Sequence, residues 1–353
     1  MLLTCALVSY CFVGENNKKQ VKSTRVRLGA YYFGSWNSSN SPHLTKLMKD
    51  SFKDRESKWG WVTGTQDIMN NQIKLASDAG LHFFSFCWYY NKKDDHGLNN
   101  AVELYLNSPN NAKLKYCLLV ANHKGFEIGP EDWPIVVDKW LRYFRKNTYL
   151  KVGGKPFITF FDLDGLLKKF GSSVAVNKAF AELKDKASKE GLNGVTIAIN
   201  THGDKWTVKM AEECGADILT GYNYHTAAFG NRSKQRIPID NLIEEERKVW
   251  NKITTASKLP YIPVATLNWD PRPWANGSNK FASDPYYTGF SKKSVYNSVK
   301  SIVNWIADNP GRTSQEKVAL LYAWNEYGEG AWLTPSKRNN KKLLEGVTAA
   351  LND

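Results

Sequence analysis

Residues 318–330 read VALLYAWNEYGEG and carry two signals in one short stretch. The first part is a continuous apolar run of aliphatic and aromatic residues, which is typical of a strand buried on both faces of a parallel sheet. Directly after the run, Glu326 and Glu329 stand three residues apart among aromatic residues and glycines. Two acids at the end of a buried strand indicate a candidate functional site.

The same apolar pattern occurs seven more times along the chain. Each run is short, nearly continuous in hydrophobicity and rich in β-branched or aromatic residues, and the eight runs are 26–33, 81–90, 114–122, 155–162, 194–200, 216–224, 261–269 and 318–325. Amphipathic patterns at helical spacing lie between them, at 65–80, 131–147, 173–191, 239–258 and 293–311. This alternation predicts an α/β fold, a single (β/α)8 TIM barrel over residues 26–353 without an internal domain boundary.

The first 25 residues differ from the rest. Residues 1–13, MLLTCALVSYCFV, are apolar but too short to span a bilayer, and residues 14–25 form a polar linker. We expect residues 1–25 to be a signal-like leader and linker, and the protein to be secreted, periplasmic or on the cell surface. A lipid anchor at Cys11 is an alternative, and no other segment predicts a membrane span.

The composition limits the partners. Among 353 residues, 48 Lys and Arg exceed 34 Asp and Glu, and the net charge of +14 favours polyanions such as nucleic acid, anionic lipid or an acidic polysaccharide. The charge is spread along the chain and no nucleic-acid-binding motif is present, so we expect no nucleic-acid partner. Cysteine and histidine spacings match no metal motif, so we predict no metal and no cofactor.

Polar and aromatic residues gather at the predicted strand ends, where (β/α)8 enzymes carry their chemistry. Amides, imidazoles and acids hydrogen-bond hydroxyl groups, while Trp and Tyr stack on the apolar faces of sugar rings. The predicted substrate-binding residues are Tyr32, Trp88, Tyr90, Asn122, His123, Asp162, Asn200, His202, Tyr224, His225, Trp269, Asp270, Arg272 and Asn325.

Several of these residues have a structural alternative. Any of the aromatic residues can fill the core, and the histidines can be held in structural hydrogen bonds. Asp270 and Arg272 can form an ion pair that fixes the seventh loop, and Asp162 can cap the helix that follows it.

Glu326 and Glu329 suit the cleavage of a glycosidic bond. One group must protonate the leaving oxygen and another must act as base or nucleophile, and two carboxyls in different environments can divide these roles. Burial beside Trp324, Tyr327 and Trp332 would raise the pKa of a carboxyl, as a general acid requires. The alternative is that one Glu caps a loop or pairs with an Arg.

The same residues carry a family resemblance. AWNEYGEGAWLTPS (323–336) resembles the WNEWGEG…EP signature of the GH99-like (WbsX) family, which is related to family 99 glycoside hydrolases, endo-acting α-mannosidases and α-mannanases. GAYYFGSW, FSFCWYYN, CLLVANHK, VGGKPFITFF and ATLNWDPRPW resemble the first, second, third, fourth and seventh strand motifs in the same order. The resemblance covers nearly the whole barrel.

The resemblance implies a role for each acid. Glu329 would be the acid/base that protonates the leaving group, and Glu326 the base that takes a proton from the sugar's own 2-hydroxyl. That hydroxyl would form a 1,2-anhydro sugar, which water opens with net retention. The chain departs from the family pattern at His123, where many relatives carry an acid, and at KWGWVTG (58–64), which lacks a Glu-Trp pair.

Together these features predict a retaining glycoside hydrolase that acts on a carbohydrate, with an α-mannoside as the family default and an anionic polysaccharide as an alternative. Two rival functions remain open. One is a glycosyltransferase of polysaccharide synthesis, and the other is a carbohydrate-binding barrel without catalysis.

Overall fold

A computed structural model describes residues 25–92, 97–230 and 235–353 of the chain. The predictions of a leader and of a lipid anchor at Cys11 fall outside the described residues.

Eight parallel strands form the barrel, and each of the eight predicted apolar runs contains one of them. They are β1 (Arg27–Tyr32), β2 (Phe83–Trp88), β3 (Lys115–Val120), β5 (Lys155–Phe160), β6 (Thr196–Asn200), β7 (Ile218–Thr220), β9 (Val264–Thr266) and β11 (Val318–Tyr322). Their order in the sheet is β7-β6-β5-β3-β2-β1-β11-β9. A parallel bridge between Leu219 and Tyr261 joins the two ends of the sheet. The predicted (β/α)8 barrel is confirmed.

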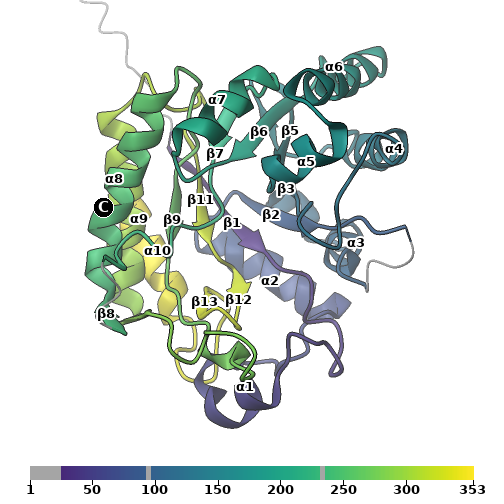
Figure 1. The fold of residues 1–353 in the computed structure, drawn as a ribbon. Helices are drawn as coiled ribbons and strands as arrows, with labels where there is room; N and C mark the ends of the chain where they lie inside the picture. Colours follow the sequence, from purple (N-terminus) through teal and green to yellow (C-terminus); the bar gives the residue numbers. More distant parts are fainter. Residues whose placement is uncertain (1–24, 93–96, 231–234) are drawn as a thin grey trace, which may run out of the picture.

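Helices follow the strands and cover the outside of the sheet (Figure 1). They are α2 (Gln66–Asp78), α3 (Asn100–Leu106), α4 (Trp133–Phe144), α5 (Leu163–Phe170), α6 (Ser173–Lys189), α7 (Lys205–Glu213), α8 (Ile239–Ala256), α9 (Lys292–Asp308) and α10 (Lys342–Asn352). The five helices predicted from amphipathic spacing are α2, α4, α6, α8 and α9. Side-chain caps fix several starts, because Ser172, Asp204 and Ser291 each accept a hydrogen bond from a backbone N–H in the first turn.

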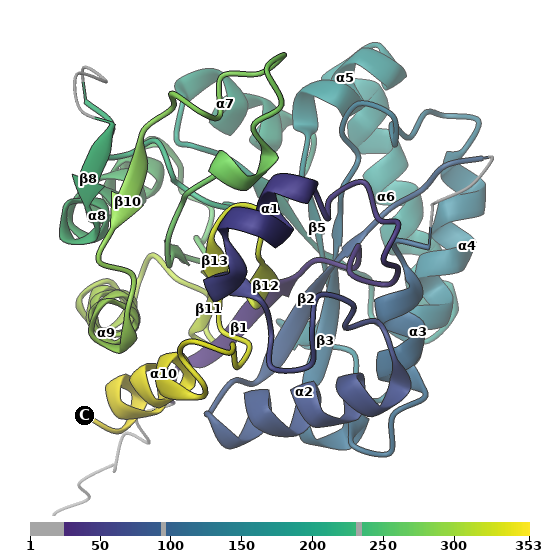
Figure 2. The ribbon, with the colours of Figure 1, turned by 90° about the horizontal axis from the view of Figure 1, so that it is seen from below.

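Shorter elements lie in the loops. They are α1 (Lys46–Ser51), the 3-10 turns η1 (Lys53–Arg55), η2 (Asn111–Lys113) and η3 (Arg272–Trp274), and the strands β4 (Lys151–Val152), β8 (Arg236–Pro238), β10 (Tyr286–Thr288), β12 (Asn325–Glu326) and β13 (Ala331–Trp332). Figure 2 shows α1, β12 and β13 lying in front of the barrel sheet. These loop elements were not predicted, and β12, β13, η1 and η3 contribute residues to the candidate site.

The layer between sheet and helices is strongly aromatic. Trp140 of α4 has no exposed surface, and its ring meets Trp88, Trp133 and Phe160 at centroid distances of 5.4–5.6 Å. All six residues of β2 are buried, as expected for a strand that has apolar contacts on both faces. Among the described residues, no helix is both long and apolar enough to cross a membrane.

Candidate active site

The two acids lie on a small hairpin that follows β11. β12 pairs antiparallel with β13, so that Glu326 lies opposite Ala331, and residues 327–330 form the turn between them. Because β11 is one of the eight parallel strands of the barrel, its carboxyl end places this hairpin at the face where the other strands also end (Figure 2). The structure thus places both acids on one short segment after the last barrel strand, and their catalytic role stays a prediction.

Asn325 connects the hairpin to the end of β1 through hydrogen bonds. Its Oδ1 accepts a hydrogen bond from the Phe33 N–H, and its Nδ2 donates to the Phe33 carbonyl, both at 2.8 Å. The Asn325 carbonyl accepts a third hydrogen bond, from Trp36 Nε1, also at 2.8 Å. Asn325 is fully buried. Its amide is therefore occupied by the protein backbone, although the sequence predicted a substrate contact.

The Glu326 carboxyl is 4% exposed, and its two oxygens have different surroundings. Oε1 accepts a hydrogen bond from the Tyr222 hydroxyl at 2.7 Å, while buried Oε2 has no hydrogen-bond partner among the described residues. Burial raises the pKa of Glu326 to about 7, and the hydrogen bond from Tyr222 acts in the opposite direction. Near neutral pH this carboxyl can therefore exist in both protonation states.

Among the described residues, the Glu329 carboxyl lacks a hydrogen bond like the one that Tyr222 donates to Glu326. Within the described part of the chain, its buried Oε2 has no hydrogen-bond partner. Burial raises the pKa of Glu329 to about 8, so that its protonated form predominates at neutral pH. The hairpin thus holds two carboxyls whose pKa values are both raised by burial, and a hydrogen bond that favours the carboxylate form reaches Glu326.

A cleft of about 510 Å³ lies near the hairpin, and neither Glu326 nor Glu329 is among its lining residues. Its lining includes Phe33, His43, Tyr89, His123 and Phe126, together with serine and asparagine side chains. Phe33 carries the backbone bonds to Asn325, and the carbonyl of His43 accepts a hydrogen bond from Trp274, whose ring packs against Gly328 of the turn. The cleft therefore adjoins the hairpin. Aromatic rings with interspersed hydroxyl and amide groups are a lining that suits a carbohydrate.

Three further predicted binding residues have different surroundings. His123 lines the cleft. The buried amide of Asn200, at the end of β6, has no hydrogen-bond partner within the described ranges. Trp269 is 8% exposed and stacks on His225 with ring centroids 3.8 Å apart. These residues keep the predicted role in sugar binding, which the fold alone does not test.

Four predicted aromatic residues point into the protein. Tyr32 packs on Phe84 and Phe86, and Trp88 packs on Trp140 of α4. The Tyr90 hydroxyl donates to Asp132 at 3.3 Å. The hydroxyl groups of Tyr224 and Tyr261 lie 2.6 Å apart in the core. Tyr32, Trp88 and Tyr224 match the structural alternative, in which aromatic residues fill the core, while Tyr90 lies after β2 with the Lys139 ammonium 5.2 Å from its ring.

The remaining predicted residues are held by neighbouring groups. Asn122 Nδ2 donates to the Asp162 carbonyl at 2.6 Å, and the Asp162 carboxylate caps α5 by accepting from the Gly165 N–H at 2.9 Å. His202 packs edge-on against Tyr224, and burial lowers the pKa of its imidazole. Capping is the alternative that the sequence left open for Asp162.

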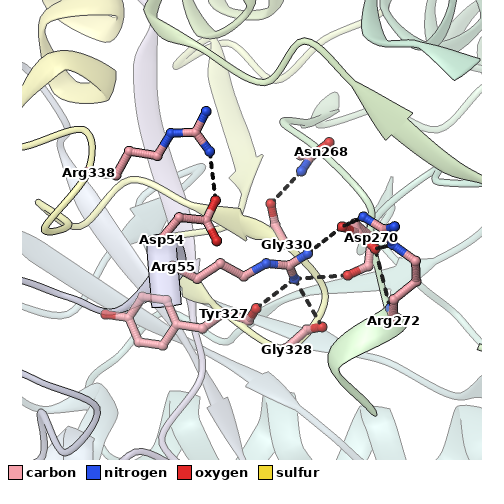
Figure 3. Close-up of polar contacts among 9 residues, drawn as sticks. All are labelled: Asp54, Arg55, Asn268, Asp270, Arg272, Tyr327, Gly328, Gly330 and Arg338. Atoms are coloured by element: carbon pink, nitrogen blue, oxygen red, sulfur yellow. Dashed lines mark hydrogen bonds and ion pairs between the residues drawn. The ribbon is translucent and has the colours of Figure 1, made fainter. Parts of the chain in front are cut away.

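Asp270 and Arg272 form the ion pair that the sequence also left open. Arg272 Nε donates to Asp270 Oδ1 at 2.7 Å and Nη2 donates to Oδ2 at 2.9 Å. A third residue, Arg55, binds the same carboxylate with Nη2 at 2.5 Å from Oδ2 (Figure 3). Both oxygens of Asp270 are thus engaged with the two guanidinium groups.

Three residues around the pair were missed by the sequence analysis. Tyr222 stands at the end of β7 like several other aromatic residues, and nothing in the sequence singles it out. Arg55 lies in a loop between β1 and α2 and has no strand-end signal. Trp274 packs against Gly328, where an added Cβ would lie 2.1 Å from the indole ring. Gly328 and Gly330, on either side of Glu329, were the signal in the sequence that an aromatic ring could pack closely against this turn.

Across residues 25–92, 97–230 and 235–353, no group of three or more His, Cys, Asp or Glu side chains is arranged to hold a metal ion.

Comparisons with known proteins agree with this fold. The model of the family described as Glycosyltransferase WbsX matches residues 61–347, so the chain belongs to the WbsX family. A comparison with curated protein sequences finds no match.

Solved structures of glycoside hydrolases have the same barrel. A GH99 endo-α-mannosidase from Bacteroides thetaiotaomicron superimposes with a TM-score of 0.62 at 15% identity, covering 92% of this chain and 96% of that one. A glycoside hydrolase-like protein has a TM-score of 0.65 at 14% identity, covering 93% and 94% of the two chains. A fungal β-1,4-galactanase has a TM-score of 0.54 at 10% identity, covering 92% and 99%. The family and the fold support a glycan-active enzyme.

Proposed function

We propose that this chain is a retaining glycoside hydrolase in which Glu329 is the general acid/base and Glu326 is the base for the sugar's own 2-hydroxyl. The observation that carries the proposal is the carboxyl pair on one hairpin, with pKa values raised to about 7 and about 8 by burial. The adjoining aromatic cleft supplies a surface for a sugar chain.

In the first step, Glu326 takes the proton of the 2-hydroxyl while O2 attacks the anomeric carbon. The bond from that carbon to the leaving oxygen breaks, and Glu329 gives its proton to that oxygen. The product is a 1,2-anhydro sugar, and no bond to the protein forms. The Tyr222 hydrogen bond favours the carboxylate form of Glu326, which this step requires.

In the second step, Glu329 accepts a proton from water, and the water oxygen attacks the anomeric carbon. The three-membered ring opens as Glu326 returns its proton to O2. Two inversions at the same carbon give net retention. Acid-base groups of this kind each contribute roughly 10²–10⁴-fold to the rate.

The pKa values set the expected pH dependence. The reactive form has Glu326 ionised and Glu329 protonated, so activity should decline below about pH 7 and above about pH 8. A narrow bell-shaped profile near pH 7.5 is therefore expected for kcat/KM.

The test is the release of sugars from a panel of α-mannans and anionic polysaccharides. Wild type, Glu329→Gln and the exposed control Glu345→Gln are compared, because the control makes the same chemical change in a carboxylate that pairs with Lys292 on the surface. Release by wild type and control, with a loss of roughly 10²-fold or more in Glu329→Gln, supports the proposal. Equal release by all three removes Glu329 from its role.

The family description favours a second candidate, a glycosyltransferase. If wild type releases no sugar from any glycan in the panel, hydrolysis is not supported. Binding of a nucleotide sugar, measured by calorimetry, would then favour the transferase. Binding of the glycans without cleavage would favour a carbohydrate-binding barrel.

The net charge of +14 also supports an anionic glycan as substrate. If long-range attraction assists binding, kcat/KM should fall as the salt concentration rises. A flat response to salt would favour an uncharged glycan such as an α-mannan.

Export of the protein remains a proposal that rests on the apolar residues 1–13. Fractionation of cells that express the full chain with a carboxyl-terminal tag tests it. Recovery in the periplasm, the medium or the cell envelope supports export, and recovery in the cytoplasm alone contradicts it.

A further inference from the structure

The turn that carries Glu329 is bound on its backbone by a buried arginine. Arg55 Nη1 donates to the carbonyl of Tyr327 at 3.0 Å and also lies 3.4 Å from the carbonyl of Gly328 (Figure 3). The same nitrogen donates to the Asp270 carbonyl at 2.9 Å. One guanidinium thus connects the catalytic turn with the loop that follows β9.

The other two carbonyls of the turn bind to that same loop. The Asp270 N–H donates to the Glu329 carbonyl at 2.7 Å, and Asn268 Nδ2 donates to the Gly330 carbonyl at 2.6 Å. All four backbone carbonyls of residues 327–330 therefore accept hydrogen bonds from outside the turn. A short loop with this many external bonds has a fixed backbone.

Asp270 in turn fixes Arg55. The side chains of Arg55 and Asp270 are only 4% and 9% exposed, and the Arg272 guanidinium occupies the outer side of the same carboxylate. Burial lowers the pKa of Arg55 to about 10, so the group remains charged at neutral pH. Arginine suits this place because its planar fork can reach several acceptors at once, whereas a lysine ammonium is a compact point charge.

Gly330 completes the arrangement. Its φ of +81° is one that side chains rarely adopt, and an added Cβ would lie 3.1 Å from Arg55 Nη1. The guanidinium therefore lies directly against the backbone of the turn.

The Glu329 carboxyl depends on this backbone for its position. Among the described residues its buried Oε2 has no hydrogen-bond partner, so no neighbouring side chain fixes that oxygen. The place of the carboxyl is then set by the turn and by packing. An error of about 1 Å in a catalytic group can lower a rate by about 100-fold.

We propose that Arg55, held by Asp270, is a positioning residue that fixes the 327–330 turn and through it the Glu329 carboxyl. This inference rests on the proposed function, because it assigns Arg55 to the orientation of the proposed acid. Arg55 itself touches no reacting atom.

The experiment compares Arg55→Met, Arg55→Lys and a control, Arg338→Gln. The control removes the neighbouring ion pair between Arg338 and Asp54, which is 2.8 Å long, exposed and without contact to the turn (Figure 3). For each variant, kcat and KM are measured on the glycan that wild type cleaves. Hydrogen exchange of the peptide that spans residues 325–332 is followed by mass spectrometry, and thermal unfolding reports the folded fraction.

In Arg55→Met we expect kcat to fall about 10- to 100-fold with KM within about threefold of wild type, because the turn moves while the cleft remains. Exchange in the 325–332 peptide should become faster. Arg55→Lys should lie between wild type and Arg55→Met in both measurements, since it keeps the charge but loses the fork. Arg338→Gln should match wild type.

A kcat of Arg55→Met within twofold of wild type would overturn the proposal, as would a loss that the unfolded fraction fully explains. If Arg55→Met does not fold, Arg55→Lys decides by the same measurements. If wild type cleaves no glycan, the proposed function fails separately, and hydrogen exchange decides alone. Unchanged exchange of the turn in the Arg55 variants then overturns the positioning role.

Discussion

Removing the Tyr222 hydroxyl should move the pH profile of the enzyme in one direction. In the structure this hydroxyl donates to Glu326 Oε1 at 2.7 Å, and the hydrogen bond opposes the effect of burial on the pKa of Glu326. The substitution Tyr222→Phe keeps the ring, which packs on Tyr31, Phe161 and Tyr322. It therefore removes the hydrogen bond to the carboxylate and a weaker contact between the hydroxyl and Cys87 Sγ at 3.8 Å.

The magnitude follows from the strength of the bond. A hydrogen bond to a charged group contributes about 1.5–3 kcal/mol, and 1.36 kcal/mol corresponds to one pH unit. The pKa of Glu326 should rise above its value of about 7 by roughly one to two pH units. Because the base must be ionised, the acidic limb of the kcat/KM profile moves to higher pH, toward or past the alkaline limb near pH 8 set by Glu329. The maximum should fall about two- to fivefold as the two limbs overlap.

The assay is the pH dependence of kcat/KM, which reports pKa values of the free enzyme. Tyr322→Phe is the matched control. The Tyr322 hydroxyl is buried and has no hydrogen-bond partner among the described residues, and its ring lies 4.9 Å from that of Tyr222. The control thus removes a neighbouring hydroxyl without removing a hydrogen bond to Glu326, and its profile should follow that of wild type.

Two results would refute this reasoning. An acidic limb that stays in place in Tyr222→Phe would mean that Glu326 is not the base seen in the profile. A limb that moves equally in Tyr222→Phe and Tyr322→Phe would assign the effect to general packing around the site.

Two further changes test the surrounding structure. Glu246 in α8 is buried, accepts a hydrogen bond from the Thr266 N–H at 2.7 Å and has its pKa raised from 4.5 to about 8. The free energy of unfolding should therefore decrease as the pH rises from about 4.5 to about 8. Glu246→Gln should stabilise the protein by up to the order of 4 kcal/mol above pH 8 and by almost nothing at pH 4. Urea unfolding of wild type and variant at both pH values checks this. Gly328→Ala should displace Trp274, because the new Cβ would lie 2.1 Å from its ring, and should lower kcat about tenfold or more. Gly311→Ala, whose Cβ would meet nothing within 4 Å, should leave kcat unchanged, and equal kcat values for both alanine variants would contradict this account.

Much of the barrel could be predicted from local patterns. Eight apolar runs of strand length and five amphipathic repeats suffice to give the (β/α)8 order, because strands covered on both faces need continuous apolar sequence. The pair Glu326 and Glu329 was also visible, since two acids among apolar and aromatic residues require an explanation. These signals are local, and each is contained in at most twenty consecutive residues.

The sequence did not predict which side chains of a strand point into the barrel and which point toward the helices. In a strand with two buried faces, the alternation of inward and outward residues leaves no trace in polarity. Trp88 and Tyr32 therefore looked like residues of the site, although they pack between the sheet and the helices. Tyr222, on the inner side, looked no different from its neighbours.

The sequence by itself determined the strands, the main helices and the segment that carries both carboxyls, because hydrophobic periodicity and chain order are enough to specify them. Only the tertiary structure decided how that segment is held. Arg55 and Asp270 are 215 residues apart in the chain and meet at the turn through a buried ion pair. No local pattern predicts such a contact, since it depends on where the ring of strands brings two distant loops. The raised pKa values of the two acids have the same origin, because burial is a property of the assembled fold.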